Sequence, residues 1–309
     1  MTSQITHGRI LKIALPMVIS NATIPILGAV DTGVIGQLGD PILLAAVGIG
    51  AIIISTIYWI FGFLRMGTTG LVAQAKGSGD QNEVFSYLIR GILIGLSAGL
   101  ALLVLHIPLF WLALNLFQAL PEVESQAETY LQIRIWSAPL SISNYAFLGW
   151  LIALERTSYV LLLQIIINLL NVLLDILFVL HLDWGIEGVA LASLIAEFSG
   201  TFLASIIAFI IFKKSGSPKI NGLFKIQKWK KIFSTNVNIL IRSIMLEIVI
   251  ISYVFFGSTL GTITLAANHI LLQFVHISSY ALDGFAFSAE ALVGSSYGEK
   301  SRKKIRDAA

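Results

Sequence analysis

The sequence predicts an all-α integral membrane protein, and two observations support this prediction. Hydrophobic residues make up 56% of the 309 residues, whereas Asp, Glu, Lys and Arg together make up only 12%. Soluble domains average about 25% charged residues. The apolar residues also gather in long runs, most of which reach or exceed the ~20 residues that a helix needs to cross a bilayer. The net charge of +3 does not indicate a nucleic-acid partner, because the basic residues cluster between the apolar runs.

These runs predict eight spanning helices. In chain order they are Ile10–Leu38, Ile42–Ala75, Val84–Phe117, Glu122–Ala153, Ser158–Leu182, Ile186–Phe212, Ile232–Thr259 and Ile263–Tyr297. We expect residues 1–212 to form an N-terminal six-helix bundle and residues 213–231 to form a basic cytoplasmic linker. Residues 232–309 would then be the first two helices of a second bundle.

The distribution of basic residues predicts the orientation in the membrane. The linker holds seven lysines and no acid, namely Lys213, Lys214, Lys219, Lys225, Lys228, Lys230 and Lys231. The loops expected on the opposite side hold Asp40, Glu122, Glu124, Glu128 and Asp183, without Lys or Arg. Basic loops stay in the cytoplasm, so we expect a multi-pass plasma membrane protein with both termini cytoplasmic. A nucleic-acid-binding or lipid-binding role is the alternative for the lysine run, but Pro218 favours a linker.

An internal repeat relates the seventh and eighth predicted helices to the first and second. Within Gly67–Gly77 and Ser288–Gly298, Leu-Val and a final Gly recur at an offset of 221 residues. Both copies would enter the membrane from the same side, which makes the repeat parallel. Chance similarity between apolar helices is the alternative. A complete second copy would need four more helices, so we expect the sequence to be truncated after its eighth helix.

The first candidate site lies in the fifth predicted helix. Asn171 and Asp175 are four residues apart, so they share one helix face. A carboxylate in the middle of a bilayer is costly and indicates a functional site. Ser193, on the next helix, supplies a hydroxyl. Its alternative role is packing, because Gly188 and Ala192 form a small-residue surface around it.

Asp31 is the second intramembrane acid, and two prolines precede it. Pro16 and Pro25 each remove a backbone donor and free the carbonyl four residues earlier, at Lys12 and Asn21. We therefore predict a helix that bends at Pro16 or Pro25 as a moving gate. The alternative is a kinked packing helix whose Asp bonds a neighbour.

Carboxylate, amide and hydroxyl oxygens form a hard ligand set, which suits a proton or an alkali cation better than a soft metal. We expect H⁺ or Na⁺ at Asp31, Asn171 and Asp175, with no other metal and no cofactor. The chain has no cysteine and no enzymatic motif. We expect the other charges in the spans to lie near interfaces or to pair with one another, namely Arg134, Glu197, Arg242, Glu247, Asp283 and Glu290.

Five segments together resemble the multidrug and toxic compound extrusion (MATE) transporters, and within them the DinF-like branch. They are Ala14-Leu15-Pro16 with Asp31, NLLNVLLDILFV (Asn168–Val179), GIEGVALAS (Gly185–Ser193), LAANHI (Leu265–Ile270) and LDGFAFSAEALVGSSYG (Leu282–Gly298). Their order and spacing are more specific than any single motif.

The resemblance implies two six-helix bundles facing each other in a V, around a cavity that opens alternately to each side. It implies a monomer that exports organic, often cationic, compounds in exchange for H⁺ or Na⁺. It places the cation site at Asp31, Asn171, Asp175 and Ser193, where the family more often has Thr, and adds Tyr130 to the network. The rivals are a lipid or polysaccharide-precursor flippase with a cationic cavity, an intramembrane enzyme, and a truncated protein that transports nothing.

Overall fold

The computed structural model describes residues 5–117, 119–218, 222–259 and 262–308, and its described side chains exclude those of 24–29 and of parts of 254–277. Throughout these ranges the regular structure is helical, which confirms the all-α prediction. The helices are α1 (His7–Gly36), α2 (Pro41–Ile60), α3 (Phe63–Gly77), α4 (Gln81–Phe117), α5 (Pro121–Arg134), η1 (Ile135–Ser137), α6 (Ala138–Ala153), α7 (Thr157–Asp175), η2 (Ile176–His181), α8 (Gly185–Lys214), α9 (Ile226–Thr259), α10 (Thr262–Gly298) and α11 (Arg302–Ala308).

Three of the eight predicted helices change along their length, the fifth where α7 passes into the π-helix η2. The second divides into α2 and α3 at a turn, where the amide of Gly62 donates to the carbonyl of Trp59 at 2.8 Å. The fourth divides into α5, the 3₁₀ turn η1 and α6, because Pro139 has no amide to continue the α-helical pattern. The seventh begins at Ile226 and not at Ile232, since the lysine-rich segment before the apolar run is itself helical.

The chain is a multi-pass membrane protein. Among the described residues, five segments are long and apolar enough to cross a bilayer, with mean hydropathy from 1.5 to 2.4. They are Pro41–Gly77, Gln81–Phe117, Thr157–His181, Gly185–Lys214 and Ile226–Tyr253. Large apolar side chains on their outer surfaces are exposed, such as Val104 at 79% and Leu116 at 77%. Such a surface suits lipid and not water.

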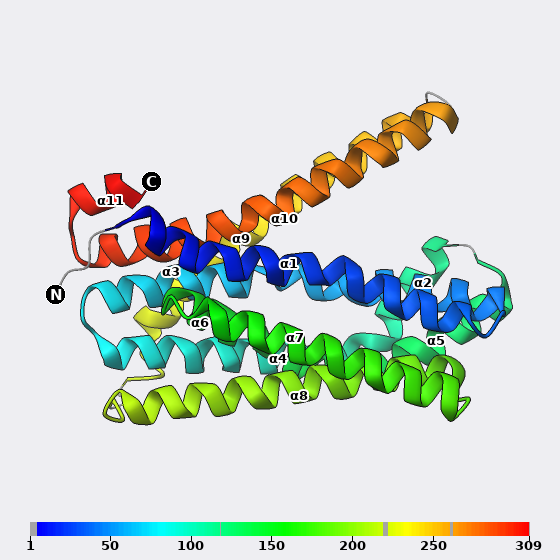
Figure 1. The fold of residues 1–309 in the computed structure, drawn as a ribbon, viewed down its shortest axis with the longest axis horizontal. Helices are drawn as coiled ribbons and strands as arrows, with labels where there is room; N and C mark the ends of the chain where they lie inside the picture. Colours follow the sequence, from blue (N-terminus) through cyan, green and yellow to red (C-terminus); the bar gives the residue numbers. More distant parts are fainter. Residues whose placement is uncertain (1–4, 118, 219–221, 260–261, 309) are drawn as a thin grey trace.

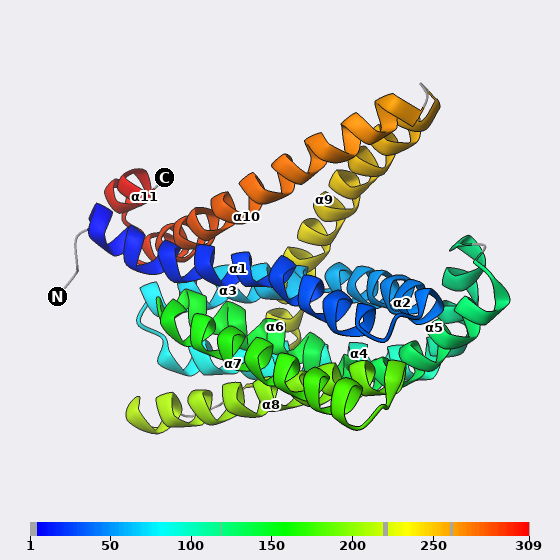
Figure 2. The ribbon, with the colours of Figure 1, turned by 45° about the vertical axis from the view of Figure 1, so that its right-hand side comes forward.

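The loops gather at two opposite ends of the molecule (Figure 1). Both ends of the described chain lie at one end, together with the α3–α4 and α6–α7 turns. The hairpin of α9 and α10 meets the other helices at this end and diverges from them toward the opposite end in both views (Figures 1 and 2). Helix α10 packs against α1 and α3. The α9–α10 hairpin is one arm of a V and the remaining helices are the other, and the V opens away from the termini.

The contact between α3 and α10 is reciprocal across the predicted repeat. A Cβ atom on Gly77 would collide with the backbone of Ser295, and one on Gly298 would collide with the backbone of Gln74. Gln74 and Ser295 are separated by the same offset of 221 residues as Gly77 and Gly298. This is the pattern expected of two helices related by a local two-fold axis. The glycines let the two backbones touch, as small residues do in membrane helix pairs.

We expect Gly77→Ala to lower stability by about 1–3 kcal/mol, because the added methyl group overpacks a backbone contact. The apparent melting temperature of the purified protein in detergent measures this. Gly48→Ala is the matched control, since a Cβ there meets nothing within 4 Å. That control should be neutral or slightly stabilising, because Ala favours a helix. Equal melting temperatures for Gly77→Ala and the control would show that α3 and α10 do not touch at this point.

A half-buried carboxylate joins three segments at the end that holds the termini. Glu155, in the α6–α7 turn, accepts hydrogen bonds from Arg9 Nη2 and from Lys76 Nζ, each at 2.7 Å. Arg9 Nε donates to the second carboxylate oxygen, also at 2.7 Å. Burial by itself raises the pKa of Glu155, but the two cations outweigh burial and hold the pKa below its ordinary value of 4.5.

We expect Glu155→Gln to destabilise the protein at neutral pH by about 1.5–3 kcal/mol, the range for a hydrogen bond to a charged group. Because the pKa is lower in the folded state, this stabilisation is present above the unfolded pKa and is lost as the pH falls through the folded one. The wild-type and variant melting temperatures should therefore converge below pH about 4.5. Glu122→Gln, an exposed acid on α5, is the control. A difference that stays constant with pH would contradict the assignment.

Candidate cation site

Helices α7 and α8 bring together the amide, carboxylate and hydroxyl predicted from the sequence. Asn171 Nδ2 donates to Ser193 Oγ at 3.2 Å. Asn171 is 1% exposed, Asp175 0% and Ser193 9%. The i, i+4 spacing places Asn171 and Asp175 one above the other on the buried face of α7. The structure therefore brings these three side chains together, and their binding of a cation stays a prediction.

The helix changes its winding immediately after Asp175. Residues Ile176–His181 form a π-helix, η2, and the amide of Leu182 donates to the carbonyl of Leu177 at 3.1 Å. A π turn widens the helix and is frequently found at functional sites. Here it starts one residue after the buried carboxylate, which gives Asp175 an irregular backbone on one side.

Asp31 joins this group from α1, which packs directly against α7. The carboxyl groups of Asp31 and Asp175 lie near one another, close enough for the charge of each to affect the other. Among the described residues, Asp31 Oδ1, Asn171 Oδ1 and both carboxylate oxygens of Asp175 are buried without a hydrogen-bond partner. Buried polar atoms are normally paired, so unpaired oxygens of this kind need an explanation such as a bound ion or proton.

Tyr130 also lies at this group. It is 3% exposed on α5 and lies near Asp31 and Arg134. Its ring occupies the space above Gly50 of α2, where an added Cβ would lie 2.5 Å from the ring. Tyr130 therefore lies beside Asp31, and its part in a cation site stays a prediction.

The structure adds an ion pair that sequence reasoning did not assign to the site. Arg134 Nη2 donates to Glu197 Oε1 at 2.7 Å, and Ser141 Oγ donates to the other oxygen of Glu197. Arg134 Nε and Nη1 are buried without a partner, and the guanidinium lies near both Asp31 and Asp175. The missed signal was spacing. Arg134 lies four residues after Tyr130, and Glu197 lies four residues after Ser193, so each shares a helix face with a residue predicted for the site.

The electrostatic balance of the group favours a cation. Arg134 is paired with Glu197, and although its guanidinium lies near Asp31 and Asp175, the three acids together outweigh its single positive charge. Buried charges of like sign cannot both stay ionised at low cost. A proton on one carboxyl or a small hard cation between oxygen ligands would relieve this repulsion. The described residues contain no group of three or more His, Cys, Asp or Glu that could hold a metal ion, so any cation would rely partly on neutral oxygens.

At the first proposed hinge, the backbone carbonyl that Pro16 frees is hydrogen-bonded by a neighbouring helix. Helix α1 runs without a break through Pro16. The carbonyl of Lys12, which Pro16 frees, accepts a hydrogen bond from Thr157 Oγ1 at 3.4 Å. The side chain of Pro25, the second proposed hinge, lies outside the described residues. Bending at either proline stays a prediction.

Arginines that a cationic cavity would require are engaged in other contacts. The Arg65 guanidinium lies 4.4 Å from the ring centroid of Phe287, and Arg242 Nη2 lies 3.2 Å from Met66 Sδ. Arg134 is held by Glu197. These contacts do not favour the flippase alternative.

Membrane-spanning helices around a buried pair of carboxylates define a class of multi-pass membrane protein with an acidic intramembrane site. The chain belongs to the MatE family, whose family model matches residues 16–177. This is a family of transporters and not of enzymes, and it confirms the resemblance drawn from the sequence motifs.

Curated relatives support the same placement. The chain is 35% identical over 299 residues to DNA damage-inducible protein F of Escherichia coli K12, covering 96% of this chain and 64% of that protein. It is 27% identical over 321 residues to a probable multidrug resistance protein NorM of Rhizobium meliloti, covering 98% of this chain and 66% of that protein. The chain thus spans about two thirds of the length of these relatives.

Solved structures show the same fold. A MATE crystal structure in the bent conformation matches with a TM-score of 0.85 at 20% identity, covering 97% of this chain and 67% of that one. A transporter of the MOP superfamily from Pyrococcus furiosus, described as having a binding pocket of reverse polarity, matches with a TM-score of 0.82 at 19% identity over 97% of this chain and 67% of that one. These matches confirm the MATE-like fold that the motifs predicted.

Proposed function

We propose that this protein acts in a secondary antiporter that exports organic cations in exchange for H⁺ or Na⁺ by alternating access. One observation carries the proposal: Asp31 and Asp175 lie near one another, and Asp31 Oδ1 and both carboxylate oxygens of Asp175 are buried without a hydrogen-bond partner. An intramembrane acid of this kind is by default functional. Relatives named as probable multidrug resistance proteins support a role in resistance to organic compounds.

In the proposed cycle, the ionised carboxyls attract either an organic cation or the coupling ion. Protonation of Asp31, or Na⁺ held by Asp31, Asn171 and Asp175, removes that attraction and allows α1 to bend at Pro16 or Pro25. A ligand drives such a change only by binding the two conformations with different affinity. Tyr130 and Ser193 would shape the site and hold the ligand oxygens in place.

We also propose the arrangement in which this cycle occurs. Residues 1–212 form the bundle that holds the cation site, residues 213–231 form a linker, and residues 232–309 begin the facing bundle. The termini lie in the cytoplasm and the protein works in the plasma membrane as a monomer. The basic loops at one end of the molecule support this orientation.

Uptake of ethidium into proteoliposomes tests the proposal, with a pH gradient or a Na⁺ gradient imposed separately. We expect one gradient to drive uptake and its collapse by an ionophore to stop it. Equilibrium binding of ethidium to the purified protein is the second measurement, and protons or Na⁺ should compete with it. Binding and uptake that are independent of both ions would contradict the proposal.

A further inference from the structure

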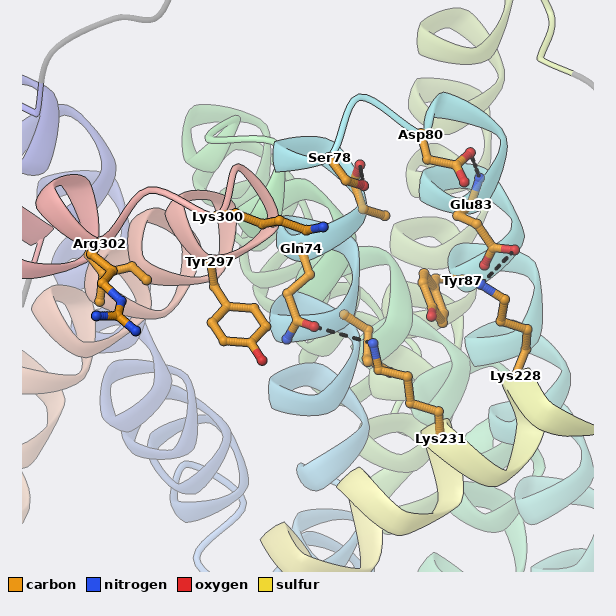
Figure 3. Close-up of a pocket in the computed structure, with 14 residues that line it drawn as sticks. Gln74, Ser78, Asp80, Glu83, Tyr87, Lys228, Lys231, Tyr297, Lys300 and Arg302 are labelled. Atoms are coloured by element: carbon orange, nitrogen blue, oxygen red, sulfur yellow. Dashed lines mark hydrogen bonds and ion pairs between the residues drawn. The ribbon is translucent and has the colours of Figure 1, made fainter.

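A cavity of about 540 Å³ opens at the end of the molecule that holds the termini (Figure 3). Its walls come from the end of α3, the start of α4, the start of α9, the end of α10 and the start of α11. The cavity lies apart from Asp31 and Asp175, neither of which lines it. Its volume falls within the range of small-ligand pockets.

Four basic side chains line the cavity: Lys228, Lys231, Lys300 and Arg302. Lys231 Nζ donates to the neutral amide oxygen of Gln74 at 3.3 Å. Among the described residues, no carboxylate lies within ion-pair distance of Lys231, Lys300 or Arg302. Three cations therefore border one hollow without an anionic partner.

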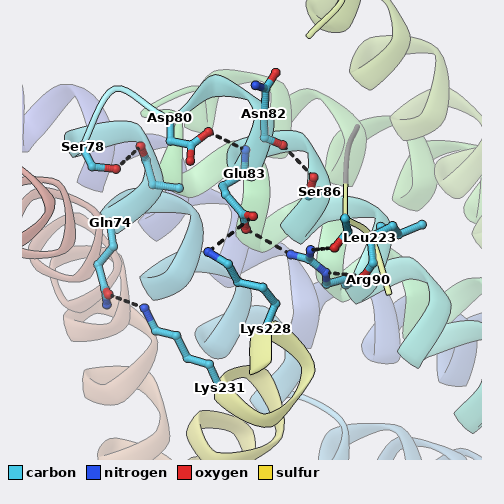
Figure 4. A network of polar contacts seen from close by, with 12 residues as sticks. Gln74, Ser78, Asp80, Asn82, Glu83, Ser86, Arg90, Leu223, Lys228 and Lys231 are labelled. Atoms are coloured by element: carbon cyan, nitrogen blue, oxygen red, sulfur yellow. Dashed lines mark hydrogen bonds and ion pairs between the residues drawn. The ribbon is translucent and has the colours of Figure 1, made fainter. Parts of the chain in front are cut away.

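One of the two acids in the lining is already paired with cations. Glu83 Oε2 accepts from Arg90 Nη1 at 3.1 Å, and Glu83 Oε1 lies 3.4 Å from Lys228 Nζ (Figure 4). Arg90 is 0% exposed and also donates to the carbonyls of Leu223 at 2.9 Å and Gly222 at 3.0 Å. This buried arginine offsets Glu83, so the cavity keeps a net positive charge.

The remaining lining is neutral or used by the backbone. Asp80 Oδ1 accepts from the amide of Glu83 at 3.0 Å and so caps the start of α4. Leu71 and Ile305 supply apolar wall, and the Tyr297 side chain, 64% exposed, stands beside the cavity (Figure 3). Basic and apolar surfaces thus meet in one hollow, which suits an amphiphile.

Lys300 occupies a backbone conformation that lysine rarely adopts. Its φ is 57°, and the turn is closed by the amide of Ser301 donating to the carbonyl of Ser296 at 3.2 Å. The left-handed region costs a residue with a side chain about 1–2 kcal/mol. This turn directs the Lys300 side chain across the cavity toward α3 (Figure 3).

We propose that this cavity binds the phosphate headgroup of an anionic phospholipid. Lys and Arg are the side chains that bind phosphate, and basic pockets between membrane helices bind lipid headgroups. The cavity lies at the ends of spanning helices, where headgroups are found, and its apolar wall fits the glycerol region. The inference goes beyond transport and does not depend on it.

Binding to the unmodified protein is the first test. The protein is purified in detergent and stripped of lipid, then titrated with phosphatidylglycerol, with phosphatidylcholine or with inorganic phosphate. We expect phosphatidylglycerol to bind at least about tenfold more tightly than phosphatidylcholine, with a matching rise in melting temperature. Equal binding of the two lipids overturns the proposal. Equal stabilisation by inorganic phosphate assigns the cavity to a soluble anion and overturns the lipid assignment.

Two charge-matched triple variants locate the site. The cavity variant is K231Q/K300Q/R302Q, and the control, which removes the same charges from exposed positions outside the cavity, is K230Q/K303Q/R306Q. We expect the cavity variant to lose the preference for phosphatidylglycerol and the control to keep it. Equal losses would show attraction to the general basic surface. All six side chains are exposed, and circular dichroism verifies folding.

Discussion

We expect Asp175→Asn to reduce ion-driven ethidium uptake by at least about 100-fold while leaving the protein folded. The substitution keeps the size of the side chain and removes only its ability to carry a negative charge. If Asp175 and Asp31 attract the coupling ion together, the remaining carboxyl cannot hold it in the same way. Initial uptake rates in proteoliposomes measure the effect, and an Asp31→Asn variant should show the same loss.

Stability separates this role from a structural one. A buried carboxylate without a partner destabilises the folded protein, so a neutral amide at the same place should leave the melting temperature unchanged or raise it. The matched control is Asp183→Asn, at an exposed loop residue with a φ of 55°, which Asn tolerates. Wild-type uptake by the Asp175 variant would refute the proposed site. Loss of activity together with loss of folding would assign Asp175 a structural role.

The second large effect is expected at the ion pair beside the site. We expect Arg134→Leu to destabilise the protein by about 3 kcal/mol, because the half-buried Glu197 is left without its cation. This value is the lower end of the range for buried pairs, since the Glu197 side chain is 25% exposed. Unfolding in a denaturing detergent, followed by circular dichroism, measures the loss.

A double variant tests whether the loss comes from the unpaired acid. Arg134→Leu combined with Glu197→Leu should recover most of the stability, because neither charge then remains buried alone. Arg306→Leu, at an exposed position on α11, controls for removal of one positive charge. A double variant no more stable than Arg134→Leu would show that packing around Arg134, and not charge, determines the effect.

The candidate site could be predicted in part because helical spacing is local. Asn171 and Asp175 share a helix face wherever α7 packs in the molecule, and a carboxylate within an apolar run is visible in the sequence alone. The pairing of Arg134 with Glu197 was not predictable in this way. It depends on how α5 and α8 approach one another, and charged residues in spans can equally well lie at an interface.

Hydropathy by itself determined that the chain is helical, where its long apolar runs lie and which acids they contain, because backbone groups in lipid must be satisfied within a helix. The motifs further indicated the family. Only the tertiary structure decided that Asp31 and Asp175 lie near one another and that Gly77 and Gly298 each face the partner helix's backbone. It also placed around one cavity three basic side chains that have no acidic partner among the described residues. These features join residues far apart in the chain, and the apolar pattern of a helix shows which faces are buried but not which helix covers them.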